Sequence, residues 1–326
     1  MSASAGVEAR HEHATPSPPT LGQPVPAPSR RETASAHAGA QLHLVNDAVL
    51  LHAARRWDRQ ADHLRATLVA GAPYVADQAR VLDAPQAGAR VRLPRGFEAR
   101  ANWSKSSRAP EFLELFGNQG DVQGNPRLEP ERGENWDAGG AWRGRGAGVT
   151  LALEFTRFAS HVRQLITFVP AAQRSMRAAN IARAEIRGEE VAWRLAWRRM
   201  AASGSYGWTS ALQTDAGNIY YGRRLPQRPE RQAYARIDAG RGPWNASVDV
   251  LELGDDFLDP INFTRVPGRT LIGASLSRAI GLVRVTLEGK NLGDRLVQDV
   301  GGYPLPGRSV FASCEAHFGG SAESQP

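Results

Sequence analysis

Arginine and tyrosine side chains in two polar stretches are the groups in this sequence best suited to binding. One stretch, AAQRSMRAANIAR, begins after Val169, and the other is NIYYGRR. Arginine makes bidentate contacts to carboxylates and stacks on aromatic rings, and tyrosine offers a flat surface with a polar tip. Together they suit an anionic ligand with aromatic groups, although such arginines also attract phosphates or simply face water. The candidate ligand-binding residues are Arg174, Arg177, Tyr220, Tyr221 and Arg223.

Other residue patterns do not support catalysis or metal binding. His11 and His13 flank Glu12, which is not the His-Glu-x-x-His pattern of a metal site. The glycine-rich segment 144–148 lies between two strand-like stretches, so it does not predict a phosphate-binding loop. No Gly-x-Ser-x-Gly motif occurs, and the single cysteine, Cys314, cannot build a cysteine zinc site. We therefore expect no enzyme activity, no catalytic residue, no metal site and no cofactor.

The composition indicates a folded chain whose positive charge is spread out. Hydrophobic residues make up 41% of the 326 residues, and the formal net charge is +7. Lys105 and Lys290 are the only lysines, so the charge is nearly all arginine, and the arginines form no compact block. A nucleic-acid partner is therefore not expected. No run of 18 apolar residues occurs, which excludes a membrane-spanning helix but not lipid-spanning strands of about 10 residues each.

Apolar and polar residues alternate along many short stretches, which is the pattern of β-strands. In VTLALEFTRF, residues 149–158, one face carries Val, Leu, Leu and Phe. In SVFASCEAHF, residues 309–318, one face is small and apolar with an aromatic end, and the other is mostly polar. FEARANW (97–103), VAWRLAW (191–197) and LVRVTLEGKN (282–291) alternate in the same way. These strands are the elements that must position the candidate residues.

The turns between the strands fall into two classes that alternate along the chain. Short turns are expected at 46–47, 94–96, 143–148, 201–204, 240–243 and 279–281, and long loops at 14–32, 59–83, 105–133, 159–180, 213–231, 254–268 and 293–307. Such sorting of loops by length is typical of outer-membrane barrels, whose closed antiparallel sheet satisfies every backbone group in lipid. The sequence therefore predicts an all-β fold, an antiparallel transmembrane β-barrel of about 14 meandering strands.

Aromatic residues near the strand ends fit the girdle that such barrels place at the membrane interface. The same residues would form an ordinary core in a soluble β protein, so that alternative stays open. The aromatic residues concerned are Trp103, Trp136, Trp142, Trp193, Trp197, Tyr206, Trp208 and Phe318.

Four motifs, in order along the chain, resemble those of TonB-dependent outer-membrane receptors. Residues 106–142 contain Arg-Ala-Pro, Gly-Asn-Pro and Leu-x-Pro-Glu, and residues 180–197 contain Asn-x-x-x-Ala-x-x-x-Gly-x-Glu. RLPQRPERQAYARI (224–237) is similar to a Leu-Pro-x-x-Pro segment, and residues 287–318 resemble the closing strands. The resemblance favours a structural role for the motif positions. These are Arg108, Pro110, Asn125, Pro126, Glu131, Asn291, Asp294, Tyr303, Pro306, Gly307, Arg308 and Phe318.

The resemblance also implies that the chain is part of a larger receptor. A complete receptor has a signal peptide, an energy-coupling box, a plug domain and a 22-stranded barrel, whereas only the barrel pattern is visible here. We therefore expect residues 1–318 to be the C-terminal part of such a barrel and residues 319–326 to be a polar tail. The strands at 7–13 and 310–318 are then left as edges. The sheet either stays half-open or closes through these two strands, and the even strand count favours closure.

The function implied by the resemblance is uptake of a large, scarce nutrient, such as a ferric siderophore or cobalamin, across the outer membrane of a Gram-negative bacterium. The candidate arginines and tyrosines suit an anionic, aromatic ferric chelate. The implied partners are outer-membrane lipid, lipopolysaccharide and, only if a plug is supplied upstream, the TonB complex. We do not expect this chain to transport actively on its own. The alternatives are a passive porin-like pore, which would show steady conductance in planar bilayers, and a soluble basic β protein, which would be extracted without detergent.

Overall fold

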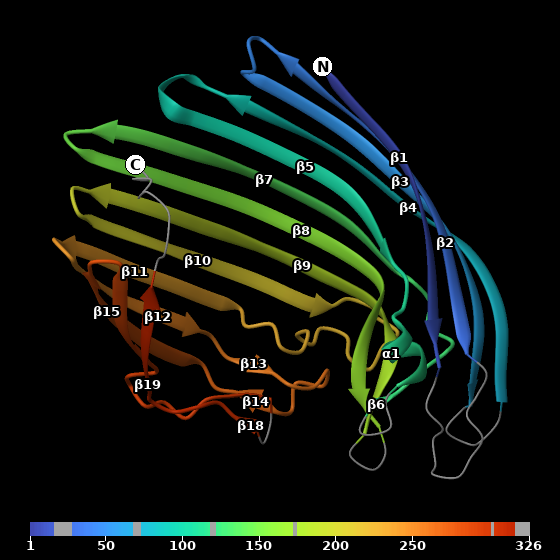
Figure 1. Ribbon diagram of the computed structural model, residues 1–326. Helices are drawn as coiled ribbons and strands as arrows, with labels where there is room; N and C mark the ends of the chain where they lie inside the picture. The colour runs from blue at the N-terminus through green and yellow to red at the C-terminus, as the bar shows by residue number, and fades with distance from the viewer. Residues whose placement is uncertain (16–27, 68–72, 118–121, 172–174, 301–302, 317–326) are drawn as a thin grey trace.

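The fold is one broad, curved β-sheet, which Figure 1 shows as an open trough. In the described part of the chain the sheet has 15 strands: 14 follow one continuous path, and the short β6 lies beside β9. The expected antiparallel β architecture with about 14 strands is confirmed. The computed structural model describes residues 1–15, 28–67, 73–117, 122–171, 175–300 and 303–316.

The long strands form the wall, and short elements lie in the loops between them. The wall strands are β1 (Ser2–Ala14), β2 (Ser29–Leu44), β3 (Val49–Thr67), β4 (Pro73–Arg92), β5 (Phe97–Arg108), β7 (Glu131–Gly146), β8 (Val149–Pro170), β9 (Met176–Trp197), β10 (Met200–Gln213), β11 (Arg231–Arg241), β12 (Trp244–Leu253), β15 (Arg269–Ile280), β16 (Val283–Lys290) and β19 (Ser309–Ala316). The short elements are η1 (Pro94–Gly96), α1 (Phe112–Phe116), β6 (Val122–Gln123), β13 (Asp256–Phe257), β14 (Arg265–Val266), β17 (Gln298–Val300) and β18 (Tyr303–Pro304). Neither helix in these ranges is long and apolar enough to cross a bilayer.

Neighbouring wall strands pair antiparallel in chain order, and the path ends at two free edges. The edges are β1 and β19, which do not pair with each other in the described ranges. The favoured expectation of closure into a smaller barrel is therefore wrong, and the half-open alternative is observed. The register and tilt of the strands fix the curvature of a sheet, and at this curvature 14 strands do not complete a circle.

Side chains alternate between an outer and an inner face, because successive residues of a strand point to opposite sides. The inner face is polar, and its charged groups reach across strands. Arg56 of β3 pairs with Glu8 of β1 (3.3 Å), and Arg100 of β5 pairs with Glu154 of β8. Both pairs skip the strand between them. Side chains that far apart meet only where the sheet curves toward them, so the polar face is the concave one.

The outer face is apolar and aromatic, and its large side chains are exposed. It includes Trp57, Trp103, Trp136, Leu153, Phe155, Val191, Trp197, Tyr206, Trp208, Ile237, Trp244, Val248, Leu276, Val285, Leu287 and Val310. The expected alternation of residues 310–316 is confirmed, since Val310, Ala312, Cys314 and Ala316 share this face. Phe318 and the tail at 319–326 lie outside the described residues.

Five of the six short turns lie at or within a few residues of their expected positions, but the turn expected at 201–204 is wrong. The chain reverses instead at Arg198 and Arg199, where Arg198 has a φ of 54°. Residues 201–204 lie inside β10. A Cβ atom on Gly204 would lie 2.8 Å from the Trp193 ring. The small residue at 204 therefore makes room for an aromatic ring rather than for a turn.

The long loops expected at 59–83 and 159–180 are mostly strand. β3 and β4 stay paired as far as Thr67, and β8 and β9 as far as Pro170. In 59–65 charged residues occupy both faces, so the apolar–polar alternation fades while the backbone pairing continues. The wall is therefore much taller on this side than the sequence pattern indicated.

Candidate functional site

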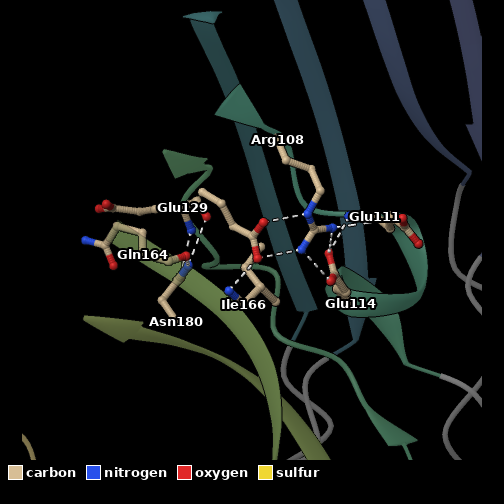
Figure 2. Close-up of polar contacts among 8 residues, drawn as sticks. Arg108, Glu111, Glu114, Glu129, Gln164, Ile166 and Asn180 are labelled. Carbon is tan, nitrogen blue, oxygen red and sulfur yellow. Dashed lines mark hydrogen bonds and ion pairs between the residues drawn. The ribbon is translucent and has the colours of Figure 1, made fainter. Parts of the chain in front are cut away.

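Arg108 fastens the loop between β5 and β7 to the inner wall (Figure 2). Its Nε and Nη2 atoms donate to Glu131 (2.8 Å each), and Nη1 and Nη2 donate to Glu114 of α1 (3.0 and 2.9 Å). Glu131 also accepts the backbone N–H of Ile166 in β8 (2.7 Å). We name Arg108, Glu114 and Glu131 the Arg108 cluster. Two bidentate contacts to one guanidinium are the strongest geometry available to this pair of residue types.

The α1 helix is a single turn held by its own acidic residues and by the wall. Glu111 and Glu114 form a capping box, in which the Glu114 carboxylate accepts the Glu111 N–H (2.7 Å). Pro110, just before the helix, is fully buried. The buried apolar cluster between helix and wall consists of Leu64, Leu115, Leu128, Ile166 and Ala178. The loop is therefore packed onto the inner face and not merely tethered to it.

Asn180 of β9 binds the backbone of β8 at Gln164 and joins it to the same loop. Gln164 has a φ of 57°, and the register of β8 with β9 is the same on both sides of it, since Arg163 is opposite Arg183 and Leu165 is opposite Ile181. The Asn180 Nδ2 atom donates to the carbonyls of Gln164 (2.7 Å) and Glu129 (3.0 Å), and its Oδ1 atom accepts the Glu129 N–H (2.9 Å). One amide side chain therefore links the backbone of β8 at Gln164 to the loop before β7.

A second ion cluster is buried on the inner face of β2, β3 and β4. Asp62 is 1% exposed and accepts from Arg31 (2.8 and 3.2 Å), Arg80 (3.3 Å) and Gln60 (2.9 Å to each oxygen). The Arg31 guanidinium also lies 5.0 Å from the centre of the Phe112 ring in α1. We name Arg31, Gln60, Asp62 and Arg80 the Asp62 cluster. Its single carboxylate is the counter-charge for two arginines.

The loops after β10 and β12 are joined into one surface by Arg224 and Asn262. Arg224 lies 3.4 Å from the Asp255 carboxylate and donates to the Asp255 carbonyl (2.7 Å). The Asn262 side chain donates to the Arg224 carbonyl (2.9 Å) and accepts its N–H (2.8 Å). These contacts fix the segment that directly follows Tyr220, Tyr221 and Arg223.

Asp259 organises the second of these loops from within. Its carboxylate accepts the N–H groups of Phe263 (3.0 Å) and Thr264 (2.6 Å). Burial by itself raises the pKa of Asp259, but these N–H donors outweigh it and hold the pKa below its usual value. The stabilisation is therefore present at neutral pH and is lost as the pH falls through that lowered pKa.

The motif residues near the C-terminus brace the loop between β16 and β19. Asn291 donates to the carbonyls of Arg295 (2.9 Å) and Pro306 (3.3 Å) and accepts the Arg295 N–H (3.0 Å). Asp294 accepts the N–H of Arg308 (2.9 Å). Gly307 lies against the Asp294 carboxylate, which would be 2.8 Å from an added Cβ atom, and Tyr303 begins β18. Asn291 and Asp294 thus hold the backbone of this loop through their side chains.

In the first motif region, Asn125 and Pro126 lie within the loop between β5 and β7. The backbone N–H of Asn125 donates to the Glu114 carbonyl (2.8 Å), and its side chain accepts the Arg127 N–H (3.1 Å). Pro126 is buried. Both residues therefore shape the return of the loop from α1 toward the wall.

The candidate ligand-binding residues lie at one end of the wall but on separate elements. Arg177 is exposed in β9, opposite Val169 and beside β6. Tyr220, Tyr221 and Arg223 lie in the loop after β10, where Tyr221 and Arg223 are exposed. Arg174 lies outside the described residues. The three loop residues lie in one segment. Arg177 lies near the start of β9, and β10 separates β9 from that loop along the chain.

Sequence reasoning missed the roles of Glu114, Asp62, Asn180 and Arg224. Asp62, Asn180 and Arg224 contact residues distant in the chain, so no local spacing marks them. Glu114 binds Arg108, only six residues before it. The nearest signal was for Asn180, which begins the second motif. Over the ranges that the structure describes, no three His, Cys, Asp or Glu side chains lie together as metal ligands.

Comparisons with known proteins identify one family. A family model for the TonB dependent receptor-like β-barrel matches residues 3–292. No curated protein matches the chain. Similar solved structures include the copper transporter OprC (16% identity, TM-score 0.74, covering 89% of this chain and 50% of that one). Others are the siderophore receptor PiuA from Acinetobacter baumannii (18%, 0.70, 88% and 43%) and the ferric-catecholate import receptor Fiu from E. coli K12 (15%, 0.72, 97% and 52%).

At these identities the likeness to solved structures shows the fold alone. The chain spans about half the length of each of these three proteins.

Proposed function

Because the chain belongs to the family of TonB-dependent receptor β-barrels, we propose that it forms part of the wall of an outer-membrane receptor that imports a large nutrient. The observation that supports this most directly is the division of the sheet into two faces. The outer face is apolar and aromatic, as contact with lipid requires, and the inner face is polar and cross-linked by ion pairs. The long loops, with the candidate residues, gather at one end of this wall.

The wall needs further strands to close in a membrane. The edge strands β1 and β19 present unpaired backbone groups, and each such group costs several kcal/mol in hydrocarbon. Family members of the plugged type close with 22 strands. We therefore propose that this wall is completed by strands and a plug supplied outside the sequence, and that uptake driven by the TonB complex depends on them.

The proposed ligand is an anionic metal chelate such as a ferric siderophore. Similar structures include receptors named for siderophores, for heme with its hemophore and for copper. In this loop Tyr220 and Tyr221 offer aromatic surface, and Arg223 offers a guanidinium group that can donate paired hydrogen bonds. These groups favour a carboxylate- or catecholate-bearing chelate over a bare metal ion, which would need ligands such as His, Cys, Asp or Glu.

Replacing the candidate loop residues is expected to weaken ligand binding at least tenfold. The variant carries alanine at Arg174, Arg177, Tyr220, Tyr221 and Arg223 in a receptor completed with its plug. Affinity for a ferric siderophore is measured by equilibrium binding to the purified receptor. A tenfold change corresponds to about 1.4 kcal/mol, a modest loss for several cationic and aromatic contacts.

The matched control carries Arg198→Ala and Arg199→Ala at the opposite end of the wall. It removes exposed arginines without touching the loops, so its affinity should stay within threefold of the parent. If the loop variant also stays within threefold, these loops are not the ligand site.

Two adjacent positions of β19 test whether the outer face meets lipid. Val310 is 63% exposed on the outer face and Phe311 is 52% exposed on the inner face. With Cys314→Ser as background, Val310→Cys and Phe311→Cys place a single thiol on either side. In vesicles a charged maleimide is expected to label position 310 at least tenfold more slowly than position 311, since charged groups avoid the hydrocarbon.

An uncharged maleimide, which enters lipid, provides the control and should label both positions. Equal labelling of the two positions by the charged reagent would mean that both faces are wet. That result would favour the soluble β protein over the membrane barrel.

A further inference from the structure

Three arginines lie side by side in one row on the outer face. Arg132 of β7 is directly opposite Arg163 of β8, and Arg163 is directly opposite Arg183 of β9. All three side chains are exposed, and Figure 1 shows β7, β8 and β9 as adjacent strands. Adjacent strands are about 4.8 Å apart, so the row places three positive charges within about 10 Å. Like charges directly opposite each other destabilise a sheet.

The acidic residues near the row have other partners. Among the residues that the structure describes, no carboxylate lies within ion-pairing distance of the three arginines. Asp83 pairs with Arg55 (2.8 and 2.9 Å), and Glu134 accepts the indole N–H of Trp103 (3.1 Å). By contrast, the outer-face arginines two and three levels closer to the short turns each have a carboxylate within 4 Å. These are Arg187 with Glu185 (3.8 Å) and Arg157 with Glu189 (3.6 Å).

The row lies just beyond the aromatic residues of the outer face. Trp103 and Trp136 are directly opposite each other, and Arg132 is four residues further toward the long loops. Four residues of strand span about 13 Å, or about 10 Å along the membrane normal at the usual tilt. Tryptophan marks the interface in such barrels. The row therefore lies at the height of the lipid head groups.

A hollow beside the row completes the surface. It has a volume of about 350 Å³ and is lined by Lys105, Arg132, His161 and Arg163 together with small and acidic residues of β4, β5 and β7. Guanidinium groups bind phosphate through paired hydrogen bonds, and lysine adds a point charge. The three guanidinium groups of the row span a longer distance than one phosphate group can contact.

We propose that Arg132, Arg163 and Arg183 form a binding site for a lipid of the outward-facing leaflet that carries more than one phosphate group. The lipid's phosphates supply the counter-charge that the residues described by the structure do not supply. The proposal rests on the proposed function, because it requires the outer face to lie in a membrane. One phosphate binds in the hollow with Lys105 and His161 at one end of the row. A second phosphate binds Arg183 at the other end.

The test measures the dissociation constant of the completed receptor, purified in detergent, for lipid A with two phosphates, with one-phosphate lipid A and inorganic phosphate as comparison probes. Replacing Arg132, Arg163 and Arg183 with glutamine is expected to weaken binding of the two-phosphate lipid at least tenfold. The matched control replaces Arg55, Arg157 and Arg187 with glutamine, which removes three outer-face charges that already have partners. The control should stay within threefold of the parent, and the one-phosphate lipid should bind more weakly than the two-phosphate lipid.

Several outcomes overturn the site. The proposed site is wrong if the variant with glutamine at Arg132, Arg163 and Arg183, called the row variant, binds the two-phosphate lipid within threefold of the parent. It is also wrong if the control variant loses as much affinity as the row variant. It is also wrong if inorganic phosphate at equal phosphate concentration displaces the lipid, which would indicate a free-anion site. If the row variant does not fold, judged by its heat-modifiable mobility in gels, Arg163→Gln alone is used with a threefold loss as the threshold. Flotation of the completed receptor with vesicles separates the two proposals. A receptor that does not float contradicts the proposed function, and one that floats but binds lipid A regardless of its phosphate number contradicts only the site.

Discussion

Replacing Asp62 with asparagine is expected to lower the free energy of unfolding of the wall by about 3–5 kcal/mol, the usual cost of removing one partner from a buried ion cluster. The substitution keeps the shape of the side chain but removes its charge. The buried Arg31 and the partly buried Arg80 would then face each other without the carboxylate that pairs with both. The loss is expected to exceed that of a single hydrogen bond several-fold.

Asp83→Asn in the same hairpin is the matched control. Asp83 also accepts two hydrogen bonds from one arginine, Arg55, but both side chains are exposed, at 39% and 51%. Exposed ion pairs contribute about 0–1 kcal/mol. The measurement is urea unfolding of the completed receptor in detergent, followed by tryptophan fluorescence. Equal losses for the two variants would show that burial of the Asp62 cluster does not matter for stability.

Replacing Arg108 with methionine is expected to cost about 2–4 kcal/mol and to release the loop between β5 and β7. Glu114 and Glu131, which are largely buried, would lose their shared cation and repel each other. The estimate is kept below that for Asp62 because the Arg108 side chain is 39% exposed. The initial rate of tryptic cleavage after Arg127 is expected to rise at least tenfold, since the loop would leave the wall more often.

Lys105→Met serves as the control, because it removes an exposed cation from the same strand but contacts neither glutamate. Arg108→Lys should fall between parent and Arg108→Met, since it keeps the charge but not the paired geometry. If Arg108→Met changes neither the unfolding midpoint nor the cleavage rate, the loop is held by its apolar contacts alone.

The strands that cross the aromatic part of the wall were predictable from the sequence, whereas their extensions were not. In residues 149–158 the two faces meet different surroundings, so side-chain polarity alternates with the pleat. Around Arg59 and Asp62 both faces carry charge, and the alternation that marks a strand disappears although the ladder continues. The turn at Arg198 was missed because a non-glycine residue adopts the left-handed conformation there.

A structural role was expected for the motif positions from their sequence, but the sequence did not identify their partners. Asn291 and Asp294 bind backbone groups within 15 residues, so their roles follow from local geometry. Arg108 depends on Glu131, and Asp62 on Arg31, each in another strand of the wall. Such pairs are set by strand register, which depends on the whole sheet. Closure of the sheet likewise depends on accumulated curvature, which no single strand encodes.

The wall strands differ in length, so the rim of the sheet is higher on one side than on the other. β8 and β9 have 22 residues each, whereas β16 and β19 have 8 each. At about 3.4 Å per residue these lengths are roughly 75 and 27 Å. Molecules diffusing toward the tall side collide with the strands before they reach the interior, whereas those arriving over the low side meet only the loop between β16 and β19. The rate at which a ligand enters should therefore depend on the side from which it approaches. Blocking the low side of the rim, at β16 and β19, should slow ligand entry far more than blocking the high side, at β8 and β9.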